Sequence, residues 1–175
     1  METEMPIWKT TLEQLEAHIL AGDSLTGGVA VAAVSAALAS SVLQMALEIA
    51  VRKRESERAR ELIELTKTAT VRLAGLADED RGAYAAYLEA RRQGSAEQKR
   101  AALRRATLTP LTAIRAAVAV LRMCGEAAGL VQGQVAADVG GAAALLAGAV
   151  RAILYSFEAN LRLQVKTATA GKSTY

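Results

Sequence analysis

Cysteine and histidine are almost absent from this chain of 175 residues, which contains one of each. The single cysteine, Cys124, excludes a disulfide within the chain, and no zinc-type spacing is present. The single histidine, His18, excludes a histidine cluster around a metal ion and leaves a serine triad only one possible base. We therefore expect no metal site, and we predict that Cys124, in an apolar stretch, is a buried structural thiol.

Proline and aromatic residues are scarce as well. The prolines are Pro6 and Pro110 alone, and aromatic side chains make up 3% of the sequence, whereas hydrophobic residues make up 52%. Many of the hydrophobic residues are alanine, the strongest helix former. With few helix breakers and no strand-like alternation, the sequence predicts an all-α bundle of long alanine-rich helices in one domain, residues 1–175.

The chain also lacks a strong excess of one charge, since its net charge is only +3 and its basic residues are dispersed. Nucleic-acid binders usually combine a dense basic stripe with aromatic side chains that stack on bases. We therefore expect no nucleic-acid partner. Neither a phosphate loop ending in Gly-Lys-Ser/Thr nor a Gly-x-Ser-x-Gly nucleophile motif occurs, so two common classes of enzyme are excluded.

The stretch 27–46 has no charge at all, and its twenty residues are long enough to cross a membrane. Its composition is mostly Ala, Ser, Gly and Val, however, and alanine contributes little to membrane insertion. A helix buried on most sides, in part by a second subunit, is the favoured interpretation. Because residues 1–11 are polar and mixed rather than a secretory signal, we expect a cytoplasmic protein that does not span a membrane.

Periodicity and capping residues define the expected helices and their breaks. Thr10 or Thr11 is expected to cap the first helix, and Ser95 followed by Gln98 has the spacing of a capping box. Asp78 to Gly82 suggests a junction between helices, Pro110 a kink, and the polar tail 166–175 frayed ends. The predicted helices cover residues 7–21, 26 to beyond 60 with a possible bend near Arg52, 64–77, 80–92, 96–128 and 135–165.

A few polar residues are candidates for chemistry. Asp78 and Asp80 lie close together in an acid-rich stretch, and Asp138 is surrounded by apolar residues, where a carboxylate is paired, protonated or functional. On the sequence alone, a helix cap or buried ion pair is the favoured role for Asp138, and an acid at a helix N-terminus is the favoured role for Asp80. Asn160 fits a hydrogen bond between helices. The glycine-rich turn at Gly27–Gly28 either presents backbone N–H groups to an anion or allows close helix packing.

Five motifs in order resemble the cyclodeaminase/cyclohydrolase family of folate one-carbon enzymes. That family includes the cyclodeaminase half of formiminotransferase-cyclodeaminase and stand-alone methenyltetrahydrofolate cyclohydrolases. The similarity covers nearly the whole chain. The matching segments are Thr11–Leu15, Gly27–Ala33 with the following helix to Lys53–Arg54, Ala77–Tyr84, Thr109–Leu111, and Ala137–Val139 with Tyr155–Leu161.

The resemblance implies a helical homodimer with a folate pocket near the dimer contact. It implies either ring closure of 5-formiminotetrahydrofolate with loss of ammonia or hydrolysis of the methenyl bridge. Neither reaction uses a metal or redox cofactor, and the tetrahydrofolate derivative is the substrate. By resemblance, Asp80 is the acid/base with Asp78 as its rival, and the substrate-binding residues are Gly27, Gly28, Lys53, Arg54, Tyr84, Asp138 and Asn160.

Several positions depart from the family pattern. In the glycine turn, Thr26 replaces proline, Val29 replaces a glycine and Ala30 replaces a serine. Valine adds a stiff branched side chain where the backbone approaches a ligand, and alanine removes a hydroxyl. These changes leave a second hypothesis open, in which the scaffold is a non-catalytic binding or assembly protein. The residues do not choose between deaminase and hydrolase.

Overall fold

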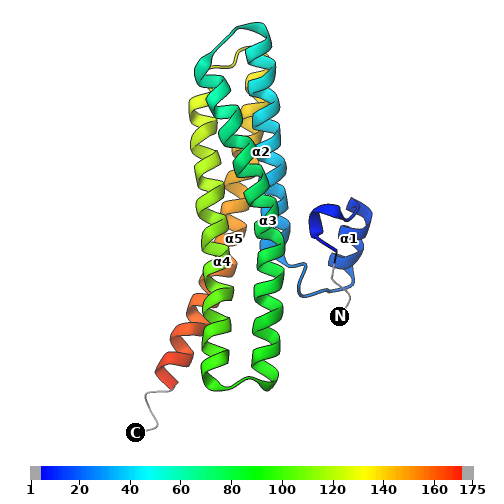
Figure 1. Ribbon diagram of the computed structural model, residues 1–175, viewed down its shortest axis with the longest axis vertical. Coiled ribbons are helices and arrows are strands. Elements are labelled where there is room, and N and C mark those ends of the chain that lie inside the picture. Colours follow the sequence, from blue (N-terminus) through cyan, green and yellow to red (C-terminus); the bar gives the residue numbers. More distant parts are fainter. Residues whose placement is uncertain (1–4, 171–175) are drawn as a thin grey trace.

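A computed structural model of the chain describes residues 5–170, with side chains described through residue 167 (Figure 1). Within that range the chain is helical and contains no strand, which confirms the predicted fold class. The elements in chain order are the short 3-10 turn η1 (Ile7–Lys9) and the helices α1 (Leu12–Leu20), α2 (Gly28–Lys53), α3 (Glu57–Gln93), α4 (Ala96–Ala127) and α5 (Val135–Ala170).

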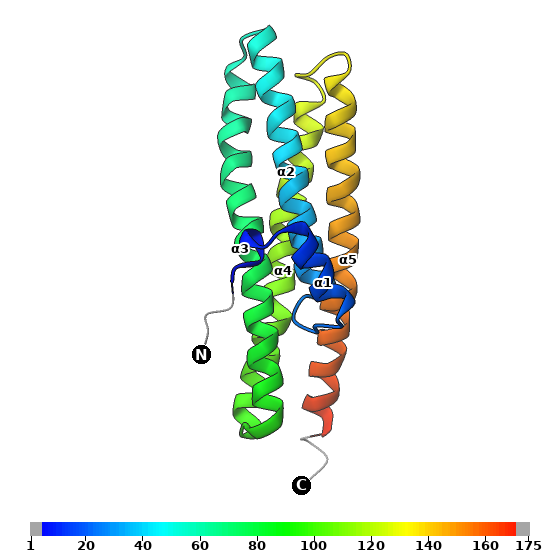
Figure 2. The ribbon, with the colours of Figure 1, turned by 90° about the vertical axis from the view of Figure 1, so that its right-hand side faces the viewer.

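Helices α2 to α5 form an up-and-down bundle in which α2 packs between α3 and α5, and α4 packs between the same two helices. Figures 1 and 2 show that α2 begins part-way along the bundle, whereas α3, α4 and α5 continue past its first turn. The bundle therefore has four helices at one end and three at the other. The cavity described below lies where α2 begins.

Small and aliphatic side chains fill the core, as the composition predicts. Leu43 and Leu47 of α2, Leu62 of α3 and Ile153 of α5 are fully buried, with alanines between them. Alanine lets helix axes approach closely, so few aromatic residues are needed to fill the interior. Cys124 is buried in this core, which confirms the prediction of a structural thiol.

Three helices within the described residues are long and apolar enough to cross a membrane, judged by length and composition alone. They are Gly28–Lys53, Ala96–Ala127 and Val135–Thr167. Most of the apolar stretch of α2 is buried inside the bundle, because α3 and α5 cover it on both sides. Burial by neighbouring helices thus explains why much of the stretch 27–46 carries no charge.

Four of the predicted helix boundaries are wrong. The expected first helix over 7–21 is divided, because Thr11 accepts the N–H of Gln14 and caps a new helix at Leu12. The second helix ends at Lys53 rather than beyond residue 60, because Ser56 caps α3 by accepting the N–H of Ala59 at 3.2 Å.

The other two errors concern continuity. No junction occurs at residues 78–82, because α3 keeps one buried face through Leu76, Ala77 and Ala83 and runs unbroken to Gln93. The last helix continues past residue 165 to Ala170, so residues 166–170 are helical rather than frayed. The remainder of the predicted frayed tail, 171–175, lies outside the described residues.

Helix α4 passes through Pro110 as one helix, and its predicted capping box at Ser95 and Gln98 is confirmed.

Candidate active site

Asp80 lies on α3 in the wall of a cavity of about 240 Å³, just beyond the first turn of α2. We call this the Asp80 cavity. Its wall is drawn from α2, α3, α4, α5 and the loop before α2, and includes Gly28, Tyr84, Ser156 and Asn160. It exists because α3, α4 and α5 continue past the point where α2 begins.

A short loop fixes the position of that helix start. The Asp23 carboxylate accepts the Thr26 hydroxyl at 2.6 Å and the Leu25 N–H at 3.0 Å. These two hydrogen bonds, that of Thr26 first, hold the pKa of Asp23 below its ordinary value. Thr26, which stands where the family has proline, is buried and so restrains the turn by hydrogen bonding instead of by a rigid ring.

Asp80 is the titratable group of the cavity. Burial raises its pKa from the ordinary 3.8 to about 6, because the ionised carboxylate loses contact with water. Its carboxyl group has no hydrogen-bond or ion-pair partner within residues 5–170. Since both protonation states are populated near neutral pH, Asp80 can take up and release a proton, as a general acid/base must.

Asp78, the rival candidate, is occupied elsewhere. Its Oδ1 accepts the Ile7 N–H at 2.8 Å and lies 3.6 Å from Nη1 of Arg81. The same arginine also donates to the carbonyl of Met5 at 3.4 Å. Asp78 therefore attaches the N-terminal segment to α3, and it does not line the Asp80 cavity.

The amide of Asn160 faces the cavity from α5. Its Nδ2 donates to the carbonyl of Ala106 on α4 at 3.0 Å, which confirms the expected hydrogen bond between helices. That bond fixes the amide plane and leaves Oδ1 as an acceptor for a ligand. Tyr84, which packs against Tyr87 with ring centroids 6.1 Å apart, also lines the cavity and gives its wall one aromatic side chain.

The N-terminus of α2 supplies backbone donors. Gly27 is the N-cap and has no side chain to accept the first N–H groups, and Gly27, Gly28 and Val29 all line the cavity. A Cβ added to Gly28 would meet no atom within 4 Å, so the space there is open. The cavity thus combines N–H donors, an amide acceptor and a titratable carboxyl group.

The remaining predicted site residues lie at the other end of the bundle. Lys53 and Arg54 line a second cavity of about 360 Å³ together with Ala50, Gly129 and Val135, which we call the Lys53 cavity. Helix α2 has 26 residues and is about 39 Å long, so Lys53 is far from Gly28. Asp138 lies in the first turn of α5, about 33 Å along the helix from Asn160.

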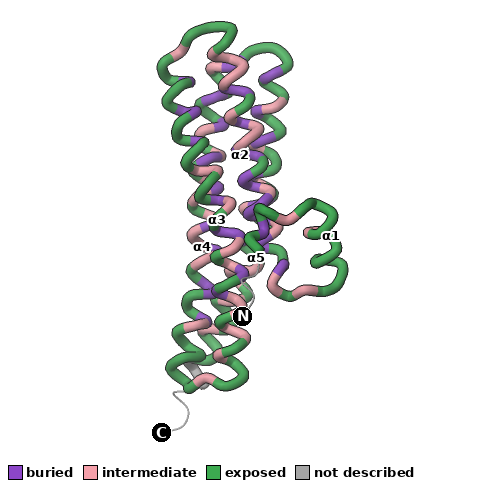
Figure 3. Tube along the Cα trace, turned by 45° about the vertical axis from the view of Figure 1, so that its right-hand side comes forward, coloured by how far each residue is buried: buried purple, intermediate pink, exposed green. Residues whose placement is uncertain are grey.

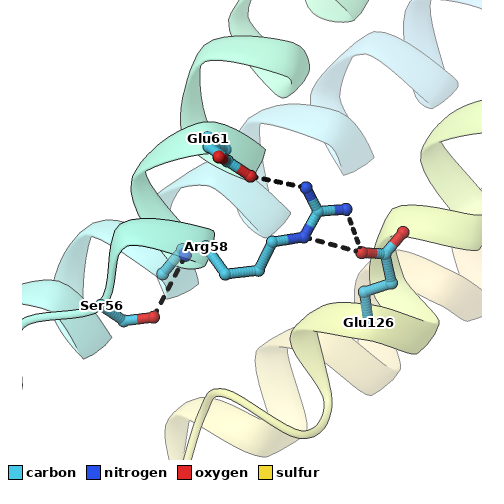
Figure 4. Close-up of polar contacts among 5 residues, drawn as sticks. Ser56, Arg58, Glu61 and Glu126 are labelled. Atoms are coloured by element: carbon cyan, nitrogen blue, oxygen red, sulfur yellow. Dashed lines mark hydrogen bonds and ion pairs between the residues drawn. The ribbon is translucent and has the colours of Figure 1, made fainter.

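The charges near the Lys53 cavity divide into paired and unpaired groups. Figure 4 shows Arg58 bound to Glu61 and to Glu126 on α4, next to the Ser56 cap. Nη1 of Arg58 lies 2.7 Å from Oε2 of Glu61. Lys53 and Arg54, by contrast, are exposed and have no ion-pair partner in the described part of the chain. Their charge is available to a ligand or to another protein surface.

Ser24 and Ser156 line the Asp80 cavity but are not among the predicted site residues. The spacing of Ser156 could have identified it, because it precedes Asn160 by four residues and shares its helix face. Val29 is buried in the wall, and Ala30 is fully buried in a small core cluster with Ile7. The position of the missing serine hydroxyl therefore faces the core.

No group of three His, Cys, Asp or Glu side chains suited to a metal ion is found between residues 5 and 170.

Residues 11–172 match the family model described as formiminotransferase-cyclodeaminase. The fold is similar to that of formiminotetrahydrofolate cyclodeaminase from Thermotoga maritima, with a TM-score of 0.81 and 20% identity over 95% of this chain and 90% of that one. Among curated proteins no significant match is found.

Proposed function

Because the chain belongs to the formiminotransferase-cyclodeaminase family, we propose that it is an enzyme of folate one-carbon metabolism with Asp80 as its acid/base. The family match indicates that area of metabolism. The finer proposal is a formiminotetrahydrofolate cyclodeaminase or a methenyltetrahydrofolate cyclohydrolase. It takes a tetrahydrofolate derivative as substrate and uses no metal or redox cofactor.

One observation supports this proposal most strongly. A half-buried carboxyl group with a pKa of about 6 stands free in a cavity, opposite an amide acceptor and beside a helix N-terminus. Groups that only support a fold are usually satisfied by partners, as Asp78 is. A carboxyl group left without a partner and with a raised pKa is typical of a proton-transfer site.

Both reactions need the proton transfers that such a group performs. In the deaminase reaction, the nitrogen outside the pterin ring attacks the formimino carbon and loses its proton, which closes the new ring, and the departing nitrogen gains a proton as ammonia leaves. In the hydrolase reaction, water attacks the methenyl carbon and loses one proton. The resulting hydroxyl group loses its second proton as the formyl carbonyl forms, and the departing nitrogen takes up a proton as its C–N bond breaks. Asp80 would accept the proton in either case and, in the first, return it to the leaving group. Asn160 and the α2 N–H groups would orient the substrate.

The alternative is a catalytically degenerate helical dimer that acts in binding or assembly. The hydroxyl lost at Ala30 and the glycine lost at Val29 in the turn motivate it. A cavity filled by Val29 and Arg52 would favour it, but Val29 lies in the wall of an open cavity and Arg52 lies at the other end of α2. The geometry therefore favours the enzyme.

The proposal includes a cytoplasmic homodimer that does not enter a membrane and has no nucleic-acid partner. Burial of most of the apolar stretch of α2 within the bundle supports the part of this proposal that concerns the membrane, for that helix. Purification without detergent tests it. A chain that stays in the membrane fraction and needs detergent to be extracted would contradict it.

Turnover of both folate substrates tests the activity. We expect the purified protein to convert one of them and the Asp80→Asn variant to lose at least about 100-fold in kcat, the usual contribution of a general acid/base. Asp78→Asn is the matched control on the same helix and is expected to keep its activity. No turnover of either substrate, or full activity of Asp80→Asn, would exclude this mechanism.

A further inference from the structure

A third cavity lies between α4 and α5, near the end of the bundle that α2 does not reach, where Figure 3 shows mostly exposed and half-buried residues. It is lined by residues of α4 within 100–111 and of α5 within 157–167, and we call it the Arg104 cavity. Its volume is about 370 Å³, within the roughly 300–1,000 Å³ of typical ligand pockets. No described residue lines both this cavity and the Asp80 cavity, so the two are separate sites.

Much of the wall of the Arg104 cavity is apolar. Leu103 of α4 is buried, whereas Leu108 and Leu161 are 47% and 43% exposed, so the cavity extends from the contact between the helices to the surface. Phe157, the one phenylalanine of the chain, is half-buried in the same wall. Exposed leucines in an open cavity favour an apolar ligand, because a ligand that covers them removes apolar surface from water.

A hydrogen bond between α4 and α5 lies on the inner side of this cavity. Gln164 of α5 donates from Nε2 to Oγ1 of Thr107 at 3.0 Å, and the Thr107 hydroxyl donates to the carbonyl of Leu103 at 2.8 Å. Thr107 is buried, and its hydroxyl thus has both a donor and an acceptor as partners. It therefore needs no hydrogen bond from a ligand, which leaves the inner part of the cavity suited to an apolar group.

Two cations also line the cavity. Arg100 and Arg104 lie four residues apart on α4, so their side chains are neighbours on one face of the helix. Both are exposed, and neither has an ion-pair partner in the described part of the chain. Among the described residues no acidic side chain lines the cavity. Like charges at this spacing destabilise a helix, so the stability of α4 does not explain the pair, whereas an anionic ligand would.

We propose that the Arg104 cavity binds a small amphipathic carboxylate, with its apolar chain on the leucine wall and its carboxylate group between Arg100 and Arg104. An uncharged apolar ligand would leave the two cations without a partner, and a small polar anion would leave the apolar wall open to water. A carboxylate with an apolar chain meets both requirements, and arginine binds carboxylates through two parallel hydrogen bonds. A medium-chain fatty acid is the simplest compound of this class. The inference does not rest on the proposed function, because the two cavities are separate.

Titration calorimetry with decanoate tests the binding without any assay of activity. We expect saturable binding at one site per chain, at decanoate concentrations below those at which it forms micelles. Acetate has the charge but no chain, and decyltrimethylammonium has the chain but the opposite charge, so neither is expected to bind. No binding of decanoate, or binding of decyltrimethylammonium as tight as that of decanoate, overturns the inference.

The double variant Arg100→Gln/Arg104→Gln tests the role of the two cations. It is expected to bind decanoate at least about tenfold more weakly, because the hydrogen bonds to the charged carboxylate are lost. Lys99→Gln/Arg105→Gln is the matched control, since it removes the same charge from exposed positions of α4 that do not line the cavity. This control is expected to bind as wild type does. An equal loss in both double variants would indicate a general effect of net charge and would overturn the inference.

Leu161→Gln tests the apolar wall. The side chain is 43% exposed, so the bundle is expected to stay folded, and decanoate should bind at least about threefold more weakly because less apolar surface is covered. Leu163→Gln is the control on the same helix, at a position that is 36% exposed and outside the cavity wall. Thermal denaturation checks that both variants are folded. Unchanged binding by a folded Leu161→Gln variant overturns the inference.

An anionic lipid surface also combines negative charge with apolar chains, and sedimentation with vesicles separates it from a free carboxylate. We expect the protein to stay in the supernatant when it is mixed with phosphatidylglycerol vesicles, with or without decanoate. Sedimentation with these vesicles that is lost in Arg100→Gln/Arg104→Gln would assign the cavity to a membrane surface. That result would overturn the inference of a small ligand.

Discussion

Replacing Asp80 by asparagine should stabilise the protein at neutral pH, because the wild-type carboxylate is held in an unfavourable environment. Burial raises its pKa from 3.8 to about 6 in the folded protein. At about 1.4 kcal/mol per pH unit, that difference corresponds to at most about 3 kcal/mol. Asparagine has nearly the same shape and carries no charge, so it avoids this cost.

The stability difference between wild type and Asp80→Asn is expected to grow as pH rises. Below pH 3.8 the carboxyl group is protonated in both the folded and the unfolded chain, and no cost arises. Between pH 3.8 and about 6 the folded state binds the proton more tightly, so the stability of the wild type falls as pH rises. Above pH 6 the loss is complete. The variant should therefore match wild type near pH 4 and exceed it most above pH 7.

Urea denaturation at pH 4 and pH 7.5 measures this difference. For a chain of this size about 3 kcal/mol corresponds to a rise in Tm of roughly 6–12 °C. Asp78→Asn is the control, since Asp78 accepts the Ile7 N–H outside the cavity and its replacement should not stabilise the protein. Equal stability of wild type and Asp80→Asn at both pH values would refute the claim that Asp80 is desolvated.

Three further predictions concern residues outside the cavity. Asp78→Ala should lower the free energy of unfolding by about 1–3 kcal/mol, measured in urea, because the N–H of the buried residue Ile7 loses its hydrogen-bond acceptor. Asp23→Asn should cost roughly 0.5 kcal/mol at pH 7, since Asp23 is only partly buried and water screens much of its charge. Because hydrogen bonding to Thr26 depresses the pKa of Asp23, that cost should vanish as pH falls below 3.8, as thermal denaturation at pH 3 and pH 7 can check. Burial raises the pKa of Cys124 to about 11, so a thiol reagent at pH 8 should label it only after unfolding.

The fold was largely predictable, because its signals are local. Few helix breakers, high alanine content and the Ser95 capping box predicted long helices, and the structure confirms them. A bend near Arg52 was one of two expectations for this segment, and α2 does end close to it, at Lys53. The end of the helix was not predicted outright, because neither glycine nor proline marks residues 54–56 and the charge pattern of the segment suits a helix. Ser56, a residue type favoured at the N-cap, followed by Glu57 as an acid in the first turn, was the available signal. The false junction at Asp78–Gly82 arose because local cap residues were given more weight than the buried face that α3 keeps through this segment.

The membership in the family was also predictable, and the match over residues 11–172 confirms it. The arrangement of the site was less accessible. That Gly28, Asp80 and Asn160 share one cavity depends on α2 beginning part-way along the bundle, which the sequence alone does not reveal. The distance from Lys53 to that cavity follows from the same helix. The sequence therefore identified the candidate residues, but it could not show which of them line the same cavity.

Direct binding of a tetrahydrofolate derivative, measured by titration calorimetry, tests the central claim that the Asp80 cavity holds a folate. Gly28→Leu places a side chain in open space at the cavity wall, and Gly75→Leu adds the same side chain to an exposed, uncrowded position on α3. Wild type and Gly75→Leu should bind equally, and Gly28→Leu should bind at least about tenfold more weakly, a difference of about 1.4 kcal/mol. No binding by wild type, or equal binding by all three proteins, would contradict the claim.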